Sequence, residues 1–142
     1  MEGAHFIKYG KLLKLSEQEC VDCDNESYGC NGGYSENCLS YAYGNVGLML
    51  ESDYPWKGQA QSCGAVYSKK ATAVEKINSI PPKSAQAIKE NIAIGPVTMT
   101  IAAGSYIFIH YFGGIITSTE CGTALTHEVS AVGYGVAKDS TT

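Results

Sequence analysis

A cysteine-rich stretch near the start of the chain, residues 16–34, constrains the fold more than any other segment. It contains Cys20, Cys23 and Cys30 and runs into the glycine pair Gly32-Gly33. A glycine pair lets the backbone turn with positive φ and leaves its N–H and C=O groups accessible, because no Cβ stands in the way. The stretch therefore predicts a ledge of open backbone that can bind a partner.

Composition and charge exclude two classes of partner. The 142-residue chain has a net charge of −4 and a pI near 5.3, and its basic residues cluster only at Lys69-Lys70. We therefore expect no binding to nucleic acid, whose phosphates require a basic surface. No apolar run reaches the roughly eighteen residues of a membrane span, and we expect no signal peptide at Met1.

The six cysteines favour an oxidising compartment, since disulfides persist there. Asn25-Glu26-Ser27 is a weak signal for N-glycosylation at Asn25 in the same stretch. The spacing of Cys20 and Cys23 would also suit a zinc knuckle or a redox pair. No histidine lies near them and no βαβ pattern precedes them, so we predict neither a metal nor another cofactor.

Periodicity and capping signals predict helices mainly in the first half of the chain and strands mainly in the second. Gly10 ends a first helix, the capping box Ser16-x-x-Glu19 starts a second, and Ser84 starts a late helix. The expected helices are 1–9, 17–23, 35–46 and 84–92, and the expected strands are 71–77, 97–101, 114–117 and 128–134. The fold class is α+β, with the change of character near Lys76.

Among the three histidines, His127 has a distinct context. It lies at the start of a predicted strand, so its ring can be held rigidly at a sheet edge facing a cleft. His5 and His110 fit ordinary surface or packed positions better. His127 is therefore the candidate for chemistry.

Several segments together resemble the papain-family (cathepsin L-like) cysteine peptidases, in order and spacing along nearly the whole chain. They are Ser16-Glu17-Gln18-Glu19, Val21-Asp22-Cys23-Asp24, Gly29-Cys30-Asn31-Gly32-Gly33-Tyr34, Asp53-Tyr54-Pro55, Gly95-Pro96-Val97, Tyr111-x-x-Gly114-Ile115 and His127-x-Val129-x-Ala131-Val132-Gly133-Tyr134-Gly135. The resemblance implies a papain-like fold with part of a helical left domain, residues 1–76, and part of an antiparallel β-barrel right domain, residues 77–142, both incomplete.

The resemblance also implies roles for individual residues. His127 would be the catalytic imidazole, which forms an ion pair with a cysteine thiolate, protonates the leaving amine and then activates water. Gly32 and Gly33 would hydrogen-bond an extended peptide substrate. The main specificity pocket would be lined by Tyr34, Ser35, Thr100, Leu125, Thr126 and Glu128.

Glu128 departs from the family pattern, in which a small residue follows the histidine. Pointing into the pocket, it would favour a basic substrate side chain and raise the pKa of His127. The alternative is a solvated carboxylate at a strand edge.

The cysteines fit the same family. The resemblance implies a Cys23–Cys63 disulfide and leaves Cys30 and Cys121 without partners in this chain. Cys20 and Cys38 replace apolar positions, either as small buried side chains or as a further disulfide.

Two catalytic segments of the family have no counterpart in the sequence. The nucleophile of a Cys-Gly-Ser-Cys-Trp segment would precede Met1, and the orienting Asn of an Asn-Ser-Trp-Gly segment would follow Thr142. We expect a truncated and inactive chain, because the triad works as a unit. A natural pseudopeptidase that binds peptides or has a structural role is the alternative. Family resemblance suggests a lysosomal, vacuolar or secreted protein.

Overall fold

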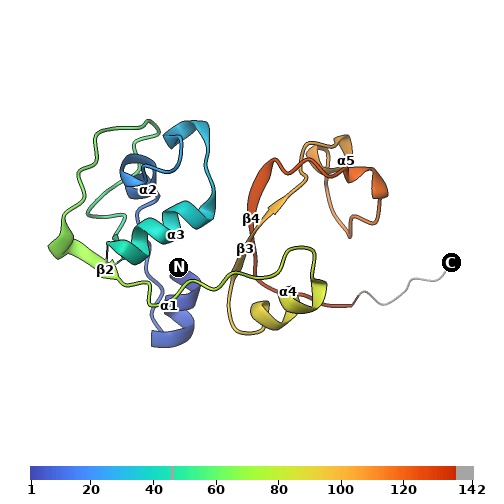
Figure 1. Ribbon diagram of the computed structural model, residues 1–142, viewed down its shortest axis with the longest axis horizontal. Helices are drawn as coiled ribbons and strands as arrows, with labels where there is room; N and C mark the ends of the chain where they lie inside the picture. The colour runs from blue at the N-terminus through green and yellow to red at the C-terminus, as the bar shows by residue number, and fades with distance from the viewer. Residues whose placement is uncertain (46, 137–142) are drawn as a thin grey trace. The chain divides into compact units, whose positions relative to one another are not determined.

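The computed structural model describes residues 1–45 and 47–136. The chain folds as two compact units, the first spanning Met1–Ser84 and the second beginning at Ala85 (Figure 1). The sequence-based division at residues 76 and 77 lies inside the segment 73–84, which has neither helix nor strand. The two divisions differ only in how this connecting segment is assigned.

The first two helices form where their end signals predict. Helix α1 spans Glu2–Tyr9 and ends at Gly10, whose φ of 69° is left-handed and whose N–H donates to the Phe6 carbonyl. Helix α2 spans Glu17–Cys23, and the Ser16 Oγ accepts the Glu19 N–H at 2.9 Å. In a complete capping box the Glu19 carboxylate would also accept the Ser16 N–H. Here the Glu19 side chain turns into the core instead.

The rest of the first unit contains short elements joined by long irregular segments. They are η1 (Gly29–Asn31), α3 (Ser35–Gly44), β1 (Leu48–Met49), η2 (Tyr67–Lys69) and β2 (Lys70–Thr72). Strand β2 pairs antiparallel with β1 alone, through Leu48 with Thr72 and Met49 with Lys70. The expected strand 71–77 is therefore wrong beyond Thr72, because β1 offers no longer edge to pair with. Helix α3 ends at Gly44 with Asn45 as its C-cap, so the expected helix 35–46 was too long, and Val46 itself lies outside the described residues.

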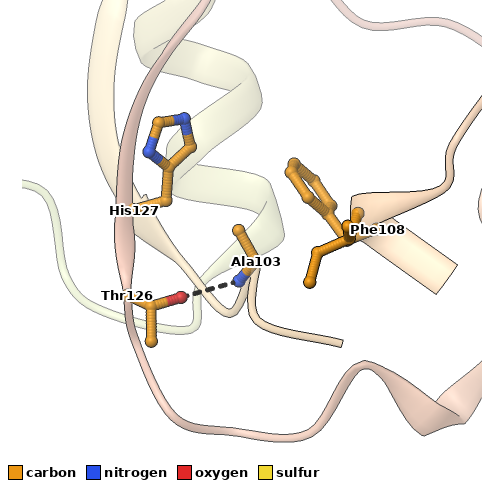
Figure 2. Close-up of a pocket in the computed structure, with 5 residues that line it drawn as sticks. Ala103, Phe108, Thr126 and His127 are labelled. Atoms are coloured by element: carbon orange, nitrogen blue, oxygen red, sulfur yellow. Dashed lines mark hydrogen bonds between the residues drawn. The ribbon is translucent and has the colours of Figure 1, made fainter. Parts of the chain in front are cut away.

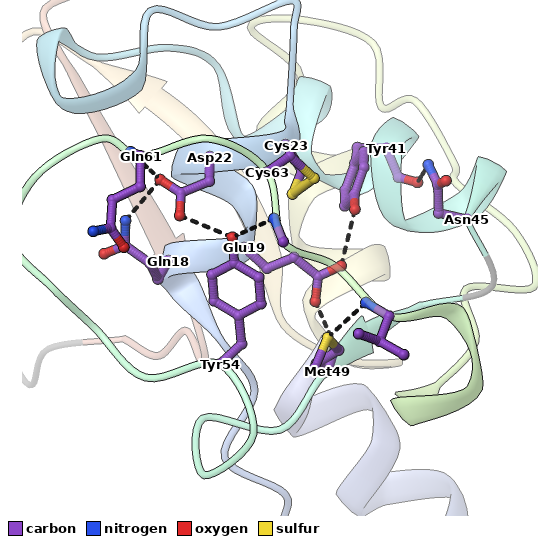
Figure 3. Close-up of a disulfide and its surroundings, with 12 residues drawn as sticks. Gln18, Glu19, Asp22, Cys23, Tyr41, Asn45, Met49, Tyr54, Gln61 and Cys63 are labelled. Atoms are coloured by element: carbon purple, nitrogen blue, oxygen red, sulfur yellow. Dashed lines mark hydrogen bonds between the residues drawn. A yellow bond between two sulfur atoms is a disulfide. The ribbon is translucent and has the colours of Figure 1, made fainter.

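A small apolar cluster and a buried polar network form the core of this unit. Leu15, Ala42 and Leu48 make up the cluster, each at most 4% exposed. Beside them the Glu19 carboxylate, fully buried, accepts the Met49 N–H at 2.7 Å and the Tyr41 hydroxyl at 2.9 Å. Figure 3 shows both contacts. The Lys70 ammonium, also nearly buried, pairs with the same carboxylate. Burial, assisted by the hydrogen bond to Glu19, raises the pKa of Tyr41.

Two disulfides brace the first unit. Cys23 bonds Cys63, the pairing that the resemblance implies, with Cα atoms 4.8 Å apart (Figure 3). Cys20 bonds Cys38, with Cα atoms 5.4 Å apart, so the alternative of a further disulfide is the one that the structure adopts. Cys20 and Cys23 thus do not pair with each other, as a redox pair would. Cys30 and Cys121 are free, as expected.

The second unit is built around one antiparallel pair of strands. Its elements are α4 (Ala85–Ile92), β3 (Val97–Ile101), α5 (Tyr106–Ile109), η3 (Thr119–Cys121) and β4 (His127–Ala131). Strands β3 and β4 pair in continuous register from Val97 with Ala131 to Ile101 with His127. The expected helix 84–92 and strand 97–101 are confirmed within one residue.

Two strand predictions in this unit need correction. Residues 114–117 form no strand, because Gly114 turns the backbone at φ 82° and no strand of the described residues pairs with them. Strand β4 starts one residue earlier than expected, at His127. It ends at Ala131 rather than at Tyr134, because Ala131 pairs with Val97, the first residue of β3. Within residues 1–45 and 47–136 the sheets are two separate pairs, so the expected β-barrel is not present as a closed sheet. No helix in these ranges is long and apolar enough to cross a membrane.

Candidate functional site

His127 is held at the end of the β3–β4 ladder. It is the first residue of β4 and lies opposite Ile101, the last residue of β3. The preceding residue extends the pairing: the Thr126 N–H donates to the Ile101 carbonyl at 2.9 Å, and the Thr126 Oγ1 accepts the Ala103 N–H at 3.1 Å. The backbone on both sides of His127 is therefore fixed, which confirms its expected position at a strand start.

The His127 imidazole borders an open pocket of about 400 Å³. The pocket is lined by Ala103, Phe108, Ile109, Thr126 and His127. Figure 2 shows the imidazole and the Phe108 ring on opposite sides of Ala103. His127 is exposed, so solvent can reach the ring nitrogens. An accessible imidazole on a fixed backbone has the placement that a general acid–base group needs.

Phe108 and Ile109 are pocket residues that the sequence analysis did not identify. They lie on α5, a single turn whose start is capped by the Ser105 Oγ accepting the Phe108 N–H at 3.3 Å. Serine is one of the residue types preferred at a helix N-cap. It could have predicted the helix, but not that the helix lies beside His127.

Glu128 follows His127 in β4 and is held in the ladder. It lies opposite Thr100 in the ladder, and its carboxylate accepts a hydrogen bond from the Thr100 hydroxyl. Both residues are half-buried. Successive strand residues point to opposite faces, and Glu128 does not line the His127 pocket. Thr100 and Glu128 are thus brought together, Thr126 joins His127, and Leu125 is 65% exposed outside the pocket lining.

The predicted glycine ledge forms a tight turn in the first unit. Gly32 has a φ of 109°, which favours glycine, as expected from the pair. Its carbonyl accepts the Tyr28 N–H at 2.9 Å and its N–H donates to the Gly29 carbonyl at 3.3 Å. In the described part of the chain the Gly33 backbone makes no hydrogen bond. Gly33 is therefore the residue of the pair whose backbone is open to a ligand.

The surroundings of Gly33 require a residue without a side chain. A Cβ at this position would lie 2.3 Å from the Ser27 Oγ. Tyr34 follows as the N-cap residue of α3 and is 63% exposed, and the half-buried Ser35 begins the helix. Asn25, the weak glycosylation signal, is exposed in the turn after α2. His127 and Gly33 belong to different units of the chain.

Comparison with known proteins identifies the family. The family model described as Papain family cysteine protease matches residues 1–142. Senescence-specific cysteine protease SAG12 of Arabidopsis thaliana is 40% identical over 95% of this chain and 39% of its own length. Germination-specific cysteine protease 1 of the same plant is 41% identical over 95% of this chain and 36% of its own length. The chain thus spans less than half the length of these curated relatives.

Solved structures agree with the sequence comparison. The crystal structure of the Carica candamarcensis cysteine protease CMS1MS2 in complex with E-64 superposes with a TM-score of 0.85 at 40% identity, covering 94% of this chain and 62% of that chain. The proform of the ragweed pollen allergen Amb a 11, a cysteine protease, gives a TM-score of 0.87 at 34% identity. The fold is papain-like. The chain belongs to the papain family of cysteine proteases.

Proposed function

We propose that this chain is part of a papain-like cysteine endopeptidase in which His127 is the catalytic imidazole. The observation that carries the proposal is the exposed His127 ring, fixed at the end of the β3–β4 ladder beside an open pocket. In acylation the imidazolium donates its proton to the leaving amine, and the neutral ring then takes a proton from the water that hydrolyses the acyl-enzyme. The thiolate would come from sequence that flanks these 142 residues.

The substrate is an extended peptide or protein segment that pairs with the backbone of Gly33. A free N–H and C=O on a glycine that cannot carry a side chain offer a peptide two hydrogen bonds without a steric barrier. Gly32 shapes this ledge. The residues assigned to the specificity pocket are Tyr34, Ser35, Thr100, Leu125, Thr126 and Glu128.

The two parts of the chain correspond to the two domains of the papain fold. Residues 1–76 are a portion of the helical left domain, and residues 77–142 are a portion of the right domain, in which β3 and β4 belong to the barrel. Two disulfides support a vacuolar, lysosomal or secreted location, because such compartments preserve them.

The test begins with the transcript on both sides of this reading frame. A flanking Cys-Gly-Ser-Cys-Trp codon run and an Asn-Ser-Trp-Gly run would support the enzyme, and stop codons in both places would contradict it. The chain with its flanks is then assayed for hydrolysis of fluorogenic peptides. We expect His127→Ala to lower kcat by about 10³-fold or more.

His110→Ala is the matched control. His110 is an exposed histidine of the same unit that follows α5 and stacks on Tyr106, so its loss should leave hydrolysis nearly unchanged. Equal losses in both variants would contradict the assignment of His127. A flanked chain that binds peptides without cleaving them would instead establish the pseudopeptidase.

A further inference from the structure

The Cys20–Cys38 disulfide joins α2 to α3 at the base of the segment that carries the glycine ledge. Cys20 lies in α2 and Cys38 in the first turns of α3, 18 residues apart in sequence. Both are half-buried and pack against the core cluster of Leu15, Ala42 and Leu48. The crosslink therefore connects the two helices on the side where they meet the core.

The segment between the helices, residues 24–34, has no apolar core of its own. Asp24 is its one buried residue, and residues 25–34 are half-buried or exposed. Its order comes from short polar contacts: the Asp24 carboxylate accepts the Glu26 N–H at 2.9 Å, and Tyr28 closes the turn onto Gly32. Such a segment takes its position from the elements at its two ends.

One of these contacts ties the segment to α3. The Asn37 side-chain amide donates to the Glu26 carbonyl at 3.0 Å and to the Ser27 Oγ at 3.3 Å. Ser27 is the residue against which Gly33 packs. A change in the distance between α2 and α3 would therefore be transmitted through Asn37 and Ser27 to the ledge.

We propose that the Cys20–Cys38 disulfide is a positioning crosslink for the Gly32-Gly33 ledge. It fixes the separation of the two helices between which the ledge is suspended, and so holds the Gly33 backbone groups ready for an extended peptide. The peptide as ligand rests on the proposed function, whereas the positioning does not. A test of backbone order in the unliganded chain separates the two.

The test compares amide hydrogen exchange in the 142-residue chain and in Cys20→Ala/Cys38→Ala. The ledge is reported by the amides of Tyr28, Asn31 and Gly32, which are hydrogen-bonded within the turn. The core is reported by the amides of Ser16 and Met49, which donate to the Met49 carbonyl and the Glu19 carboxylate. We expect the protection of the ledge amides to fall on the order of tenfold more than that of the core amides.

Two further variants control for lost stability and lost volume. Cys20→Val/Cys38→Ala replaces the crosslink with apolar volume, and its ledge should be equally loosened. Cys23→Ala/Cys63→Ala removes the other disulfide, which joins α2 to the extended segment after Trp56, and should lower protection in ledge and core alike. An equal fall in ledge and core, or no fall, in both Cys20–Cys38 variants would overturn the proposal. Failure of both to fold would also overturn it, because the crosslink would then serve the whole unit.

Discussion

The two units of this chain differ in how completely they bury their side chains. In the first unit Leu15, Ala42, Leu48 and Met49 are buried, together with the Glu19–Lys70 pair, and two disulfides tie the helices and the loops together. In the second, every described residue from Ala85 to Val136 is half-buried or exposed, and its order rests on the β3–β4 ladder. The glycine ledge thus lies in the unit with a buried core, which we call the closed unit. His127 lies in the unit whose described residues are all half-buried or exposed, which we call the open unit.

The contrast indicates that the two units contribute in different ways. A closed core with a buried polar network fixes one arrangement, because each displaced group would lose its partner. A two-stranded ladder with few buried apolar groups opens locally at low cost. Paired substitutions of one residue type, one in each unit, can test this difference.

Of the paired substitutions, replacement of a glutamate should show the largest difference between the units in the free energy of unfolding. Glu19→Ala removes the carboxylate that holds Lys70, Tyr41 and the Met49 N–H, and leaves the nearly buried Lys70 ammonium unpaired. We expect a loss of about 3–5 kcal/mol in the free energy of unfolding. Urea unfolding monitored by the fluorescence of Trp56, the single tryptophan of the chain and a residue of the first unit, measures it.

Two control variants accompany Glu19→Ala. Glu120→Ala, at an exposed glutamate of the second unit, should change stability by less than about 0.5 kcal/mol. Glu19→Leu/Lys70→Met removes both charges and should recover much of the loss. A small effect of Glu19→Ala would mean that the network does not hold the first unit together.

Replacement of a leucine in each unit should show the next largest difference in the free energy of unfolding. Leu48→Ala opens a cavity in the cluster at a residue only 4% exposed, and we expect a loss of about 2–5 kcal/mol. Leu125→Ala, 65% exposed in the second unit, should cost less than about 0.5 kcal/mol. Trp56 fluorescence for Leu48 and far-UV circular dichroism for Leu125 follow the two transitions. Comparable losses would contradict the description of the second unit as open.

Serine caps offer a finer comparison. Ser16 and Ser105 each cap a helix, and each Oγ accepts an N–H three residues on. Ser16 is almost fully buried and also donates to the Tyr54 carbonyl at 2.6 Å, so Ser16→Ala should cost about 1–2 kcal/mol. Ser105→Ala, at a half-buried cap of a single turn, should cost about 0.5 kcal/mol. Thermal unfolding measures the loss of stability in each variant. A larger loss in Ser105→Ala than in Ser16→Ala would contradict this expectation.

The smallest expected effect is a change in how steeply stability falls at alkaline pH. Burial and the hydrogen bond to Glu19 raise the pKa of Tyr41 in the folded chain, and burial raises that of Tyr54. Above the unfolded pKa of about 10 the unfolded state loses protons that the folded state keeps, so stability falls as pH rises further. Tyr41→Phe should make this fall in stability shallower, and Tyr54 should account for part of the fall that remains. Unfolding free energies at pH 8 to 11 measure the slope, and an unchanged slope would contradict the role of Tyr41.

Local signals predicted much of the fold because they depend on neighbours in sequence. The Ser16 cap, the Gly10 stop and the strand 97–101 follow from adjacent residues. Residues 114–117 and 73–77 have strand-like composition, but a strand requires a partner edge, and none of the described strands pairs with them. Composition alone cannot show that absence.

Only part of the candidate site could be predicted, because local context specifies some of its residues and tertiary packing specifies the others. His127 at a strand start and Gly32 with positive φ were read correctly from local context. Phe108 and Ile109 were missed, because their place beside His127 depends on how α5 packs after β3. The pairing of Glu128 with Thr100 was not predicted, because no local pattern specifies the ladder register.

The sequence by itself determined the family, the ends of α1 and α2, the glycine turn and the histidine, since each depends on residues close together along the chain. The tertiary structure decided that Glu19 turns inward to Lys70 and Met49, that Cys20 bonds Cys38, and that the strands end where they do. These outcomes join residues up to 51 positions apart. Only the folded chain brings such groups together, and their free energy depends on the burial that results.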